Sequence, residues 1–549
     1  MEEESHGSNY GETETSSSAS TSDSILNSSD HSTHASRPAE RITIYEEKED
    51  KGEDSDCYVV CCKRLKHAPP ITQDRISALP NSILLNILSS LPTKDAIKTG
   101  VLSKRWSYVW TSVPSLSFSD DYENTDHFAT AVDNTLLLHK APKLAKFYLR
   151  FNYKPDLKPR LDLWVRLATN AMVEQLSLRL TYAHVFNFET YLLPQHLYTN
   201  QFVSELDFSF CNIKPIGVVH LSSLKRLCIG YTALCGDDIR KVVMGSPRLE
   251  NLELNNCCRL NRLDIVSESL KKLVINNHFM LTAAGKIDDP VFELEIVAPK
   301  IESLEILGTF CMKKCRIKDV SSLVKAKLDF SMAVLKVEEE SACNEYQEAV
   351  RELLESLHHV KELFVGKWCL MVLSLMSVKH VPSPLLKCKY VTVKTSMKKW
   401  DLPGIASLLQ SLPYVETLVI DISHHNLGFK ILERHYLSYY NYDDVSHWKS
   451  KEIYFKFLLL CLKTVKIFGF GENLVNIKEV FVLVVQFLLK NANVMEKMII
   501  SKPRVMQNQR KSGWIGGQWT PASRAVYNLS DTVARCTTQD KYRISLIEA

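Results

Sequence analysis

The sequence contains few residues whose types and spacing could perform chemistry. Three cysteines within residues 57–62 could bind zinc as thiolates, but their Cys-x-x-x-Cys-Cys spacing lacks a second ligand pair. The pairs His358-His359 and His424-His425 would need distant partners to hold a metal, because neighbouring residues point to different faces. Gly469 and Gly471 lack the spacing and the following Lys-Ser/Thr of a phosphate-binding loop. Serine-hydrolase, zinc-protease and paired-carboxylate motifs are also absent, so we expect no enzyme activity, metal or cofactor.

Composition describes an ordinary water-soluble chain. Its 549 residues are 45% hydrophobic and 24% charged, and the net charge of +4 gives no reason to expect a nucleic-acid ligand. The 15 cysteines are scattered through apolar segments, as at Cys228 and Cys461, which is typical of reduced thiols. The amino terminus lacks a secretory signal, and the apolar run at residues 480–489 is half the roughly 20 residues of a membrane span. We expect a protein of the nucleus and/or cytoplasm that does not enter membranes.

The first part of the chain has the composition of a disordered tail. Residues 1–70 are rich in Ser, Thr, Glu and Asp, and cannot offset the entropy of ordering. An acidic run at residues 46–56 is followed by the basic tetrapeptide at residues 63–66. That tetrapeptide is either a short nuclear import signal or a solvated linker.

Residues 74–110 contain three short helical patterns with more apolar surface than so small a unit can bury alone. Pro80 precedes the first helix, Pro92 ends it, and Thr93 can cap the second. The third helix carries Trp106 and Trp110 on one face. Such a unit usually needs a partner surface, which implies that it is a docking module.

This pattern resembles an F-box of the version found in many plant proteins. The matching strings are Leu79-Pro80, then Ile87-Leu88-x-x-Leu91-Pro92, then Val101-Leu102-Ser-Lys-Arg-Trp106. The resemblance implies an F-box over residues 73–115 that docks a Skp-type adaptor and, through it, a cullin. The residues expected to bind the adaptor are Leu79, Pro80, Ile83, Leu84, Ile87, Leu91, Pro92, Val101, Leu102 and Trp106. The alternative is a helical cap on a repeat domain with no partner.

One frame, an apolar residue followed by two others and Leu-x-Leu, recurs at intervals of about 20 to 35 residues as far as residue 306 and at wider intervals beyond it. Its copies occupy residues 173–178, 203–208, 224–229, 249–254, 270–275, 301–306, 360–365 and 415–420. The frame predicts a leucine-rich-repeat solenoid over residues 120–450, with parallel strands inside and helices or loops of varied size outside. Together with the helical unit this is an α/β fold, a short three-helix F-box followed by the solenoid.

The middle residue of each Leu-x-Leu is expected to face the exposed concave side. These residues are Ser177, Asp207, Cys228, Glu253, Val274, Glu305, Phe364 and Val419. Their mixed chemistry offers no catalytic pair or metal set. We interpret the row as a surface for holding another protein.

Residues 451–502 resemble the FBD region found near the carboxyl terminus of many plant F-box/leucine-rich-repeat proteins. The matching elements are the Leu-Lys-x-Val-x-Ile string ending at Ile467, the Phe-Gly-Phe-x-Gly-like turn, and Asn-Ala-x-Val-Met-Glu-Lys-Met ending at Met498. The residues themselves predict a strand, a glycine turn, a helix from about residue 476 to 490, and a strand that could close the solenoid. Residues 503–549 show no clear element, and we expect an irregular tail.

These features favour a non-enzymatic, substrate-recruiting subunit of an SCF-type (Skp-cullin-F-box) ubiquitin ligase, with an unidentified protein as its substrate. Two alternatives remain. A hormone co-receptor would use a small molecule to complete the concave face, but it needs a pocket of basic and aromatic side chains that the sequence does not locate. A repeat scaffold would keep the F-box without ligase function.

Overall fold

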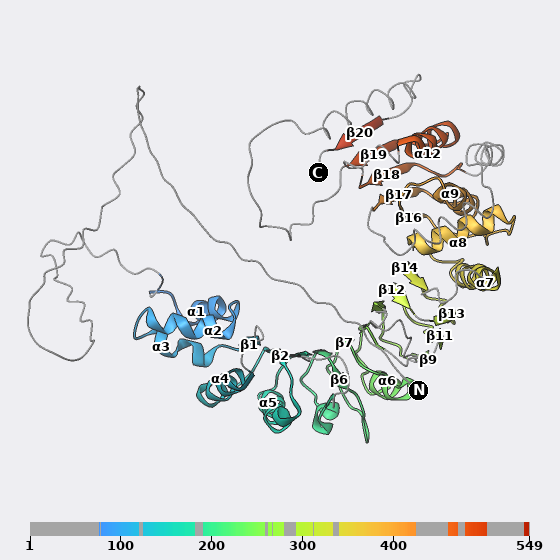
Figure 1. Ribbon diagram of the computed structural model, residues 1–549. Helices are drawn as coiled ribbons and strands as arrows, with labels where there is room; N and C mark the ends of the chain where they lie inside the picture. Colours follow the sequence, from blue (N-terminus) through green and yellow to red (C-terminus); the bar gives the residue numbers. More distant parts are fainter. Residues whose placement is uncertain are drawn as a thin grey trace, which may run out of the picture. The chain divides into compact units, whose positions relative to one another are not determined.

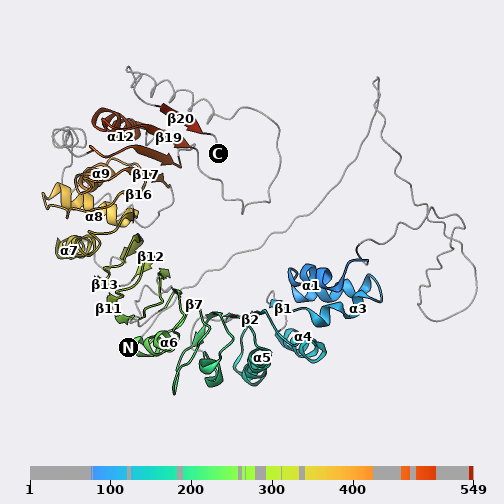
Figure 2. The ribbon, with the colours of Figure 1, turned by 180° about the vertical axis from the view of Figure 1, so that it is seen from behind.

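The computed structural model describes residues 76, 78–119, 125–181, 190–257, 262–265, 267–278, 292–310, 312–332, 340–423, 459–469, 478–501 and 543–547. The expected disordered tail at residues 1–70, its cysteine group, its basic tetrapeptide and the pair His424-His425 lie outside these ranges. The described residues form a small helical unit and one long parallel sheet with helices along one side (Figure 1). Figure 2 gives the view from behind.

The helical unit contains α1 (Asn81–Ser89), α2 (Thr93–Lys98), η1 (Thr99–Val101), α3 (Trp106–Val109) and η2 (Trp110–Ser112). Its core consists of Leu84, Leu88, Ala96, Trp106, Trp110 and Val113. Pro80 stands at the N-cap of α1, as expected, but the hydroxyl of Thr93 does not cap α2. That hydroxyl instead accepts a hydrogen bond from Ser117 N at 2.7 Å, which connects α2 to the edge strand β1 (Ser115–Ser119).

The main sheet contains fifteen of the described strands, and all neighbours run parallel. In spatial order the strands are β1 (Ser115–Ser119), β2 (Lys146–Asn152), β3 (Gln175–Thr181), β5 (Glu205–Ser209), β7 (Arg226–Gly230), β8 (Asn251–Asn255), β10 (Lys272–His278), β12 (Ser303–Phe310), β14 (Lys325–Met332), β15 (Glu362–Val365), β16 (Tyr390–Thr395), β17 (Thr417–Ile422), β18 (Thr464–Phe468), β19 (Lys497–Ser501) and β20 (Arg543–Ile547). This is the parallel stack that the repeated frame predicts.

The first and last positions of Leu-x-Leu form two buried rows. Leu206 pairs in register with Leu227, and Phe208 pairs with Ile229, and all four are at most 3% exposed. Each added strand extends the same aliphatic core, so burial depends on stacking rather than on any single repeat.

The connections between strands contain helices and short strands. Within the described ranges, eight connections contain helices: α4 (Thr125–Leu138), α5 (Lys158–Asn170) after η3 (Pro155–Leu157), η4 (Gln195–Thr199), α6 (Gly236–Met244), α7 (Glu340–Ser356), α8 (Lys367–Val378), α9 (Asp401–Gln410) and α12 (Lys478–Asn491). Short strands also occur in the connections. Strand β4 (Tyr191–Leu192), which precedes η4, pairs with β6 (Cys211–Asn212), and β9 (Arg262–Asp264), β11 (Phe292–Val297) and β13 (Met312–Lys318) form a second small sheet. The sequence frame did not predict these small sheets.

The most apolar helices are core elements. All residues of α8 from Trp368 to Ser377 are buried, and the apolar run at residues 480–489 lies in α12, largely buried as well. No helix in the described ranges is long and apolar enough to cross a bilayer.

The carboxyl-terminal strands partly correct the sequence interpretation. Strand β18, a turn at Gly469, α12 and β19 follow the predicted strand–turn–helix–strand order. Gly469 has φ +83°, and a Cβ there would clash with Ile422 O, so only glycine fits. The expectation that residues 503–549 contain no element is wrong for Arg543–Ile547, because β20 pairs with β19 in parallel. The strand β19 therefore does not close the sheet.

Candidate functional site

The helical unit exposes apolar side chains on several of its elements. On α1, Leu84 and Leu88 point into the core, while Ile83 and Ile87 lie one turn apart on the neighbouring face, each 44% exposed. Burial of two positions fixes the orientation of the helix, so the isoleucine pair is held toward solvent.

The segment between α2 and α3 presents the most exposed pair. Val101 is 88% exposed and Leu102 is 64% exposed, and Tyr108 on α3 is exposed as well. The Arg105 guanidinium fixes this segment against the start of α1, where Nη2 donates to Leu79 O at 2.6 Å and to Asn81 Oδ1 at 2.7 Å. The exposed apolar residues of α1, of the segment between α2 and α3, and of α3 are together called here the apolar docking surface, which is defined by Ile83, Ile87, Val101, Leu102 and Tyr108.

Two of the ten residues expected on this surface are elsewhere. Leu84 is 0% exposed and Trp106 is 3% exposed, and both are core residues of the helical unit. Leu79 and Leu91 are half-buried against the same core, while Pro80 and Pro92 are exposed. The expectation that the tryptophans need a partner to cover them is wrong, because the three helices enclose both of them. Tyr108 was not predicted, although its spacing from Trp106 already places it on another face of the helix.

The middle residues of the frame form one continuous row on the sheet face opposite the helices, called here the open face. In register, Ser177 lies opposite Asp207, Asp207 opposite Cys228, and Cys228 opposite Glu253. The row continues through Val274 and Glu305. These positions are half-buried, as expected for a face in contact with solvent.

Val419 is the exception among the eight predicted middle residues. It lies in the same register, opposite Thr392, but is only 4% exposed. The expectation that it faces solvent is wrong. Phe364 keeps its predicted place opposite Lys327, whose Nζ lies 5.1 Å from the centre of the phenylalanine ring.

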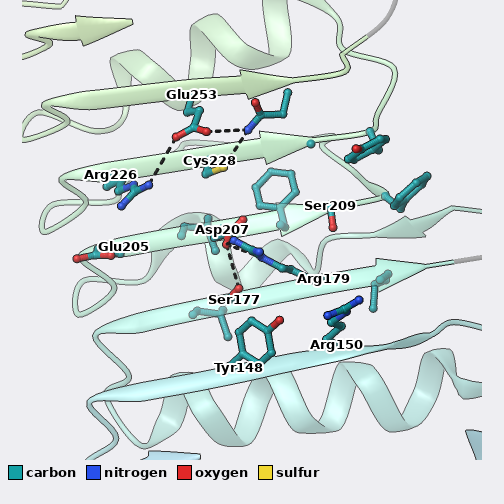
Figure 3. Close-up of a pocket in the computed structure, with 18 of the residues that line it drawn as sticks. Tyr148, Arg150, Ser177, Arg179, Glu205, Asp207, Ser209, Arg226, Cys228 and Glu253 are labelled. Atoms are coloured by element: carbon teal, nitrogen blue, oxygen red, sulfur yellow. Dashed lines mark hydrogen bonds and ion pairs between the residues drawn. The ribbon is translucent and has the colours of Figure 1, made fainter. Parts of the chain in front are cut away.

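A groove of about 840 Å³ lies on the open face across β2, β3, β5, β7, β8 and β10 (Figure 3). Its acidic side chains are paired with neighbours. Asp207 accepts from Arg179 Nη2 at 2.7 Å and from Ser177 Oγ at 3.1 Å. Glu253 lies 3.5 Å from Arg226 Nη2, and Glu205 accepts from Gln175 Nε2 at 3.2 Å.

The thiol in this groove is not suited to nucleophilic chemistry. Burial, together with the nearby carboxylates of Asp207 and Glu253, raises the pKa of Cys228 to about 12. The group is therefore a thiol rather than a thiolate at neutral pH.

Tyr148, Arg150, Phe210 and Tyr231 are among the lining residues that the sequence interpretation did not single out. Tyr148 is the middle residue of a repeat in which phenylalanine replaces the first leucine of Leu-x-Leu. Arg150 lies two residues further along the same strand, and Phe210 and Tyr231 directly follow β5 and β7. A search of the frame that admits phenylalanine would have found Tyr148, whereas the aromatic pair depends on backbone turns that the frame does not encode.

The histidine pair at His358-His359 is bound to the backbone. Nδ1 of His358 lies 2.8 Å from Glu355 O, and Nε2 of His359 lies 2.8 Å from Val320 O. Within the described ranges, no three His, Cys, Asp or Glu side chains are grouped so that they could hold a metal ion.

Comparison with known proteins identifies the same two domains, an F-box domain and an LRR domain. Residues 76–118 match the F-box domain, and residues 136–526 match the At1g61320/AtMIF1 LRR domain. F-box/LRR-repeat protein At5g02910 of Arabidopsis thaliana is 32% identical over 436 residues, which cover 78% of this chain and 88% of that protein. F-box/LRR-repeat protein At3g03360 of the same plant is 32% identical over 66% of this chain and 73% of that protein. F-box protein At5g03100 is 33% identical over 57% of this chain and 95% of that protein.

A helical docking unit joined to a leucine-rich-repeat sheet is the architecture of an F-box substrate adaptor. The chain belongs to the plant F-box/LRR-repeat family. The LRR match extends through residues 451–502, so the region resembling an FBD falls within the repeat domain here, and its FBD assignment stays a prediction.

Proposed function

We propose that this protein is the substrate-recruiting subunit of an SCF-type ubiquitin ligase. The apolar docking surface binds a Skp-type adaptor, which connects to a cullin, and the open face of the repeats holds a target protein. The observation that carries the proposal is the exposure of Ile83, Ile87, Val101 and Leu102 on a unit that otherwise has a complete core.

The proposed mechanism is proximity rather than chemistry by this chain. Holding a target beside a ubiquitin-loaded enzyme raises the effective concentration of the target's lysines. The groove supports this division of labour, because Cys228 is a protonated thiol and the acidic groups are paired. We propose that the protein itself catalyses no reaction and acts in the nucleus and/or cytoplasm.

Co-purification tests the adaptor contact. The full chain is expressed with a plant Skp-type adaptor and a cullin, and the complex is isolated through the adaptor. We expect the wild-type chain to co-purify with both, and the Ile83→Glu, Ile87→Glu double variant to be lost, because two carboxylates would be desolvated in the contact. Leu163→Glu, at a 53% exposed position on α5, is the matched control.

A double variant that still co-purifies would contradict the assignment of this surface. A wild-type chain that binds the adaptor but never a cullin would favour the scaffold alternative.

The hormone co-receptor alternative now has a definite location, because the groove brings Arg150 and Arg179 together with Tyr148 and Tyr231. The groove is open, however, and the Arg179 and Arg226 side chains are 53% and 54% exposed. Small-molecule sites bury most of their ligand, so this geometry favours an extended ligand.

A further inference from the structure

The groove on the open face has an uneven floor. One row of directly opposite residues runs Arg150, Arg179, Ser209, Gly230 and Asn255 across five strands. The short Ser209 and Gly230 leave a depression between the arginines and the asparagine. With β10 included, the groove crosses six strands, or roughly 24 Å at about 4.8 Å per strand, which matches about seven residues of extended chain.

The acidic side chains of the groove have partners among neighbouring residues, whereas some of the basic side chains do not. Each carboxylate has a partner: Asp207 bonds Arg179 and Ser177, Glu253 pairs with Arg226, and Glu205 bonds a glutamine. Arg150 is exposed and makes no ion pair or hydrogen bond with the residues that the structure describes, and Figure 3 shows its side chain directed along the groove without a partner. Lys146 is the first residue of β2. Its Nζ lies 5.8 Å from the centre of the Tyr148 ring, and it has no carboxylate partner in the described ranges. Two cations, Lys146 and Arg150, therefore stand against one carboxylate, Glu205, whose hydrogen-bond partner is a neutral glutamine, and the balance of charge in the groove is positive.

An aromatic wall borders the depression. Phe210 and Tyr231 stack with their ring centres 4.7 Å apart and their planes at 11°. Both residues have left-handed backbones, with φ +56° and +52°, which cost about 1 kcal/mol or more for a bulky residue. Tyr231 is nevertheless 49% exposed, so a stacked pair at strained positions is held toward the groove rather than buried. The residue after β8, Asn256, has the same left-handed backbone, so this turn recurs in successive repeats and places the two rings side by side.

We propose that this groove binds an acidic peptide segment of the target, in which Asp or Glu lies next to an aromatic residue. The carboxylate meets Arg150 and the adjoining face of Arg179, and the aromatic side chain packs on the Phe210–Tyr231 stack. Basic segments are disfavoured because Asp207 and Glu253 are already paired with arginines and Lys146 and Arg150 would repel a cation. Nucleic acid is disfavoured because it carries a phosphate at every nucleotide and would bring several of them against Glu205, Asp207 and Glu253, whereas the peptide needs only one carboxylate, placed at Arg150. The identity of this segment as part of the ubiquitination target depends on the function proposed above.

Selection from a peptide library tests the proposal. Random heptapeptides displayed on phage are selected on the immobilised full chain, on Arg150→Glu, and on Arg248→Glu as the control at an exposed turn outside the groove. We expect the wild type and the control to enrich peptides with Asp or Glu beside Phe, Tyr or Trp. We expect Arg150→Glu to lose them, and Tyr231→Ala to keep the acidic preference without the aromatic one.

Affinity for a recovered peptide gives the magnitude. Loss of a charged hydrogen bond corresponds to roughly a tenfold or larger increase in Kd for Arg150→Glu, together with a weaker dependence on salt. Unchanged thermal midpoints verify that the variants fold. Absence of enrichment, enrichment of Lys or Arg, equal affinity for Arg150→Glu, or tighter binding of a single-stranded heptanucleotide would each overturn the proposal.

Adaptor co-purification of the same variants separates the two hypotheses. Groove variants should retain the Skp-type adaptor. A chain that binds acidic peptides without an adaptor would refute only the ligase role, whereas a chain that binds the adaptor and no acidic peptide would refute only the groove assignment.

Discussion

Replacing Val101 and Leu102 together with alanine should weaken adaptor binding without destabilising the protein. The two side chains are 88% and 64% exposed, so most of their apolar area is available to a partner. Full burial of such a side chain contributes about 1.5–3 kcal/mol, and the double change therefore removes about 2–4 kcal/mol of binding free energy. That loss raises Kd roughly 30- to 1000-fold.

The contrasting change is Leu84→Ala. Leu84 is 0% exposed in the core of the helical unit, so its truncation should cost about 2–5 kcal/mol of unfolding free energy. The Val101→Ala, Leu102→Ala variant should change that free energy by about 0.5 kcal/mol or less, as is usual for surface positions. Binding should weaken in both variants, but for different physical reasons.

Calorimetric titration with a purified Skp-type adaptor measures Kd, and urea denaturation measures stability. Leu163→Ala on α5 is the control for loss of an exposed leucine. The reasoning fails if the Val101→Ala, Leu102→Ala chain binds as tightly as wild type. It also fails if that variant is destabilised as much as Leu84→Ala.

Three further changes test the repeat domain. Asp133 on α4 accepts from Arg160 Nη2 and Trp164 Nε1, both at 2.6 Å, so Asp133→Leu should lower the unfolding free energy by about 2–3 kcal/mol in urea; a change below about 0.5 kcal/mol would contradict the role of this contact between α4 and α5. Burial lowers the pKa of Lys367 from 10.5 to about 8, so the unfolded chain binds more protons between these values and stability should rise with pH across that window. Lys367→Met should flatten this rise in thermal midpoint, and an unaltered pH profile would refute the assignment. Gly469→Ala should lower the thermal midpoint, because φ is +83° and the new Cβ would meet Ile422 O; an unchanged midpoint would show that this turn relaxes freely.

The repeat domain was predictable because the apolar positions of its sequence frame are the positions that are buried in the fold. Leu-x-Leu with an apolar residue three positions earlier specifies which side chains point inward, and the register confirms this for Leu206, Leu252 and Ile306. The same frame with other apolar residues occurs at Phe147-x-Leu149 and Ala326-x-Leu328, which the leucine-based search missed. Burial selects volume and hydrophobicity rather than leucine itself.

The groove was harder to predict from the sequence than the repeat domain. The row of middle residues could be listed, but ion pairing between strands depends on register and side-chain reach, as for Arg179 with Asp207. The aromatic wall depends on left-handed turns at Phe210 and Tyr231, which carry no composition signal because bulky residues rarely adopt them. Likewise, helical periodicity marked Leu84 and Trp106 as apolar but could not say whether this chain or a partner covers them.

The helical unit passes into the sheet almost without a linker. Val113 belongs to the helical core, and Leu116 belongs to the core of the sheet. Across this junction Ser117 N donates to Thr93 Oγ1, Lys140 N donates to Thr111 O, and the His139 ring contacts Val113 O. If the two surfaces hold adaptor and target as proposed, the protein keeps them at a fixed distance and orientation, which a flexible linker would not do. Ubiquitin would then reach only lysines within a narrow zone of the captured protein, and a few glycines inserted after Ser112 would broaden that zone while leaving both affinities intact.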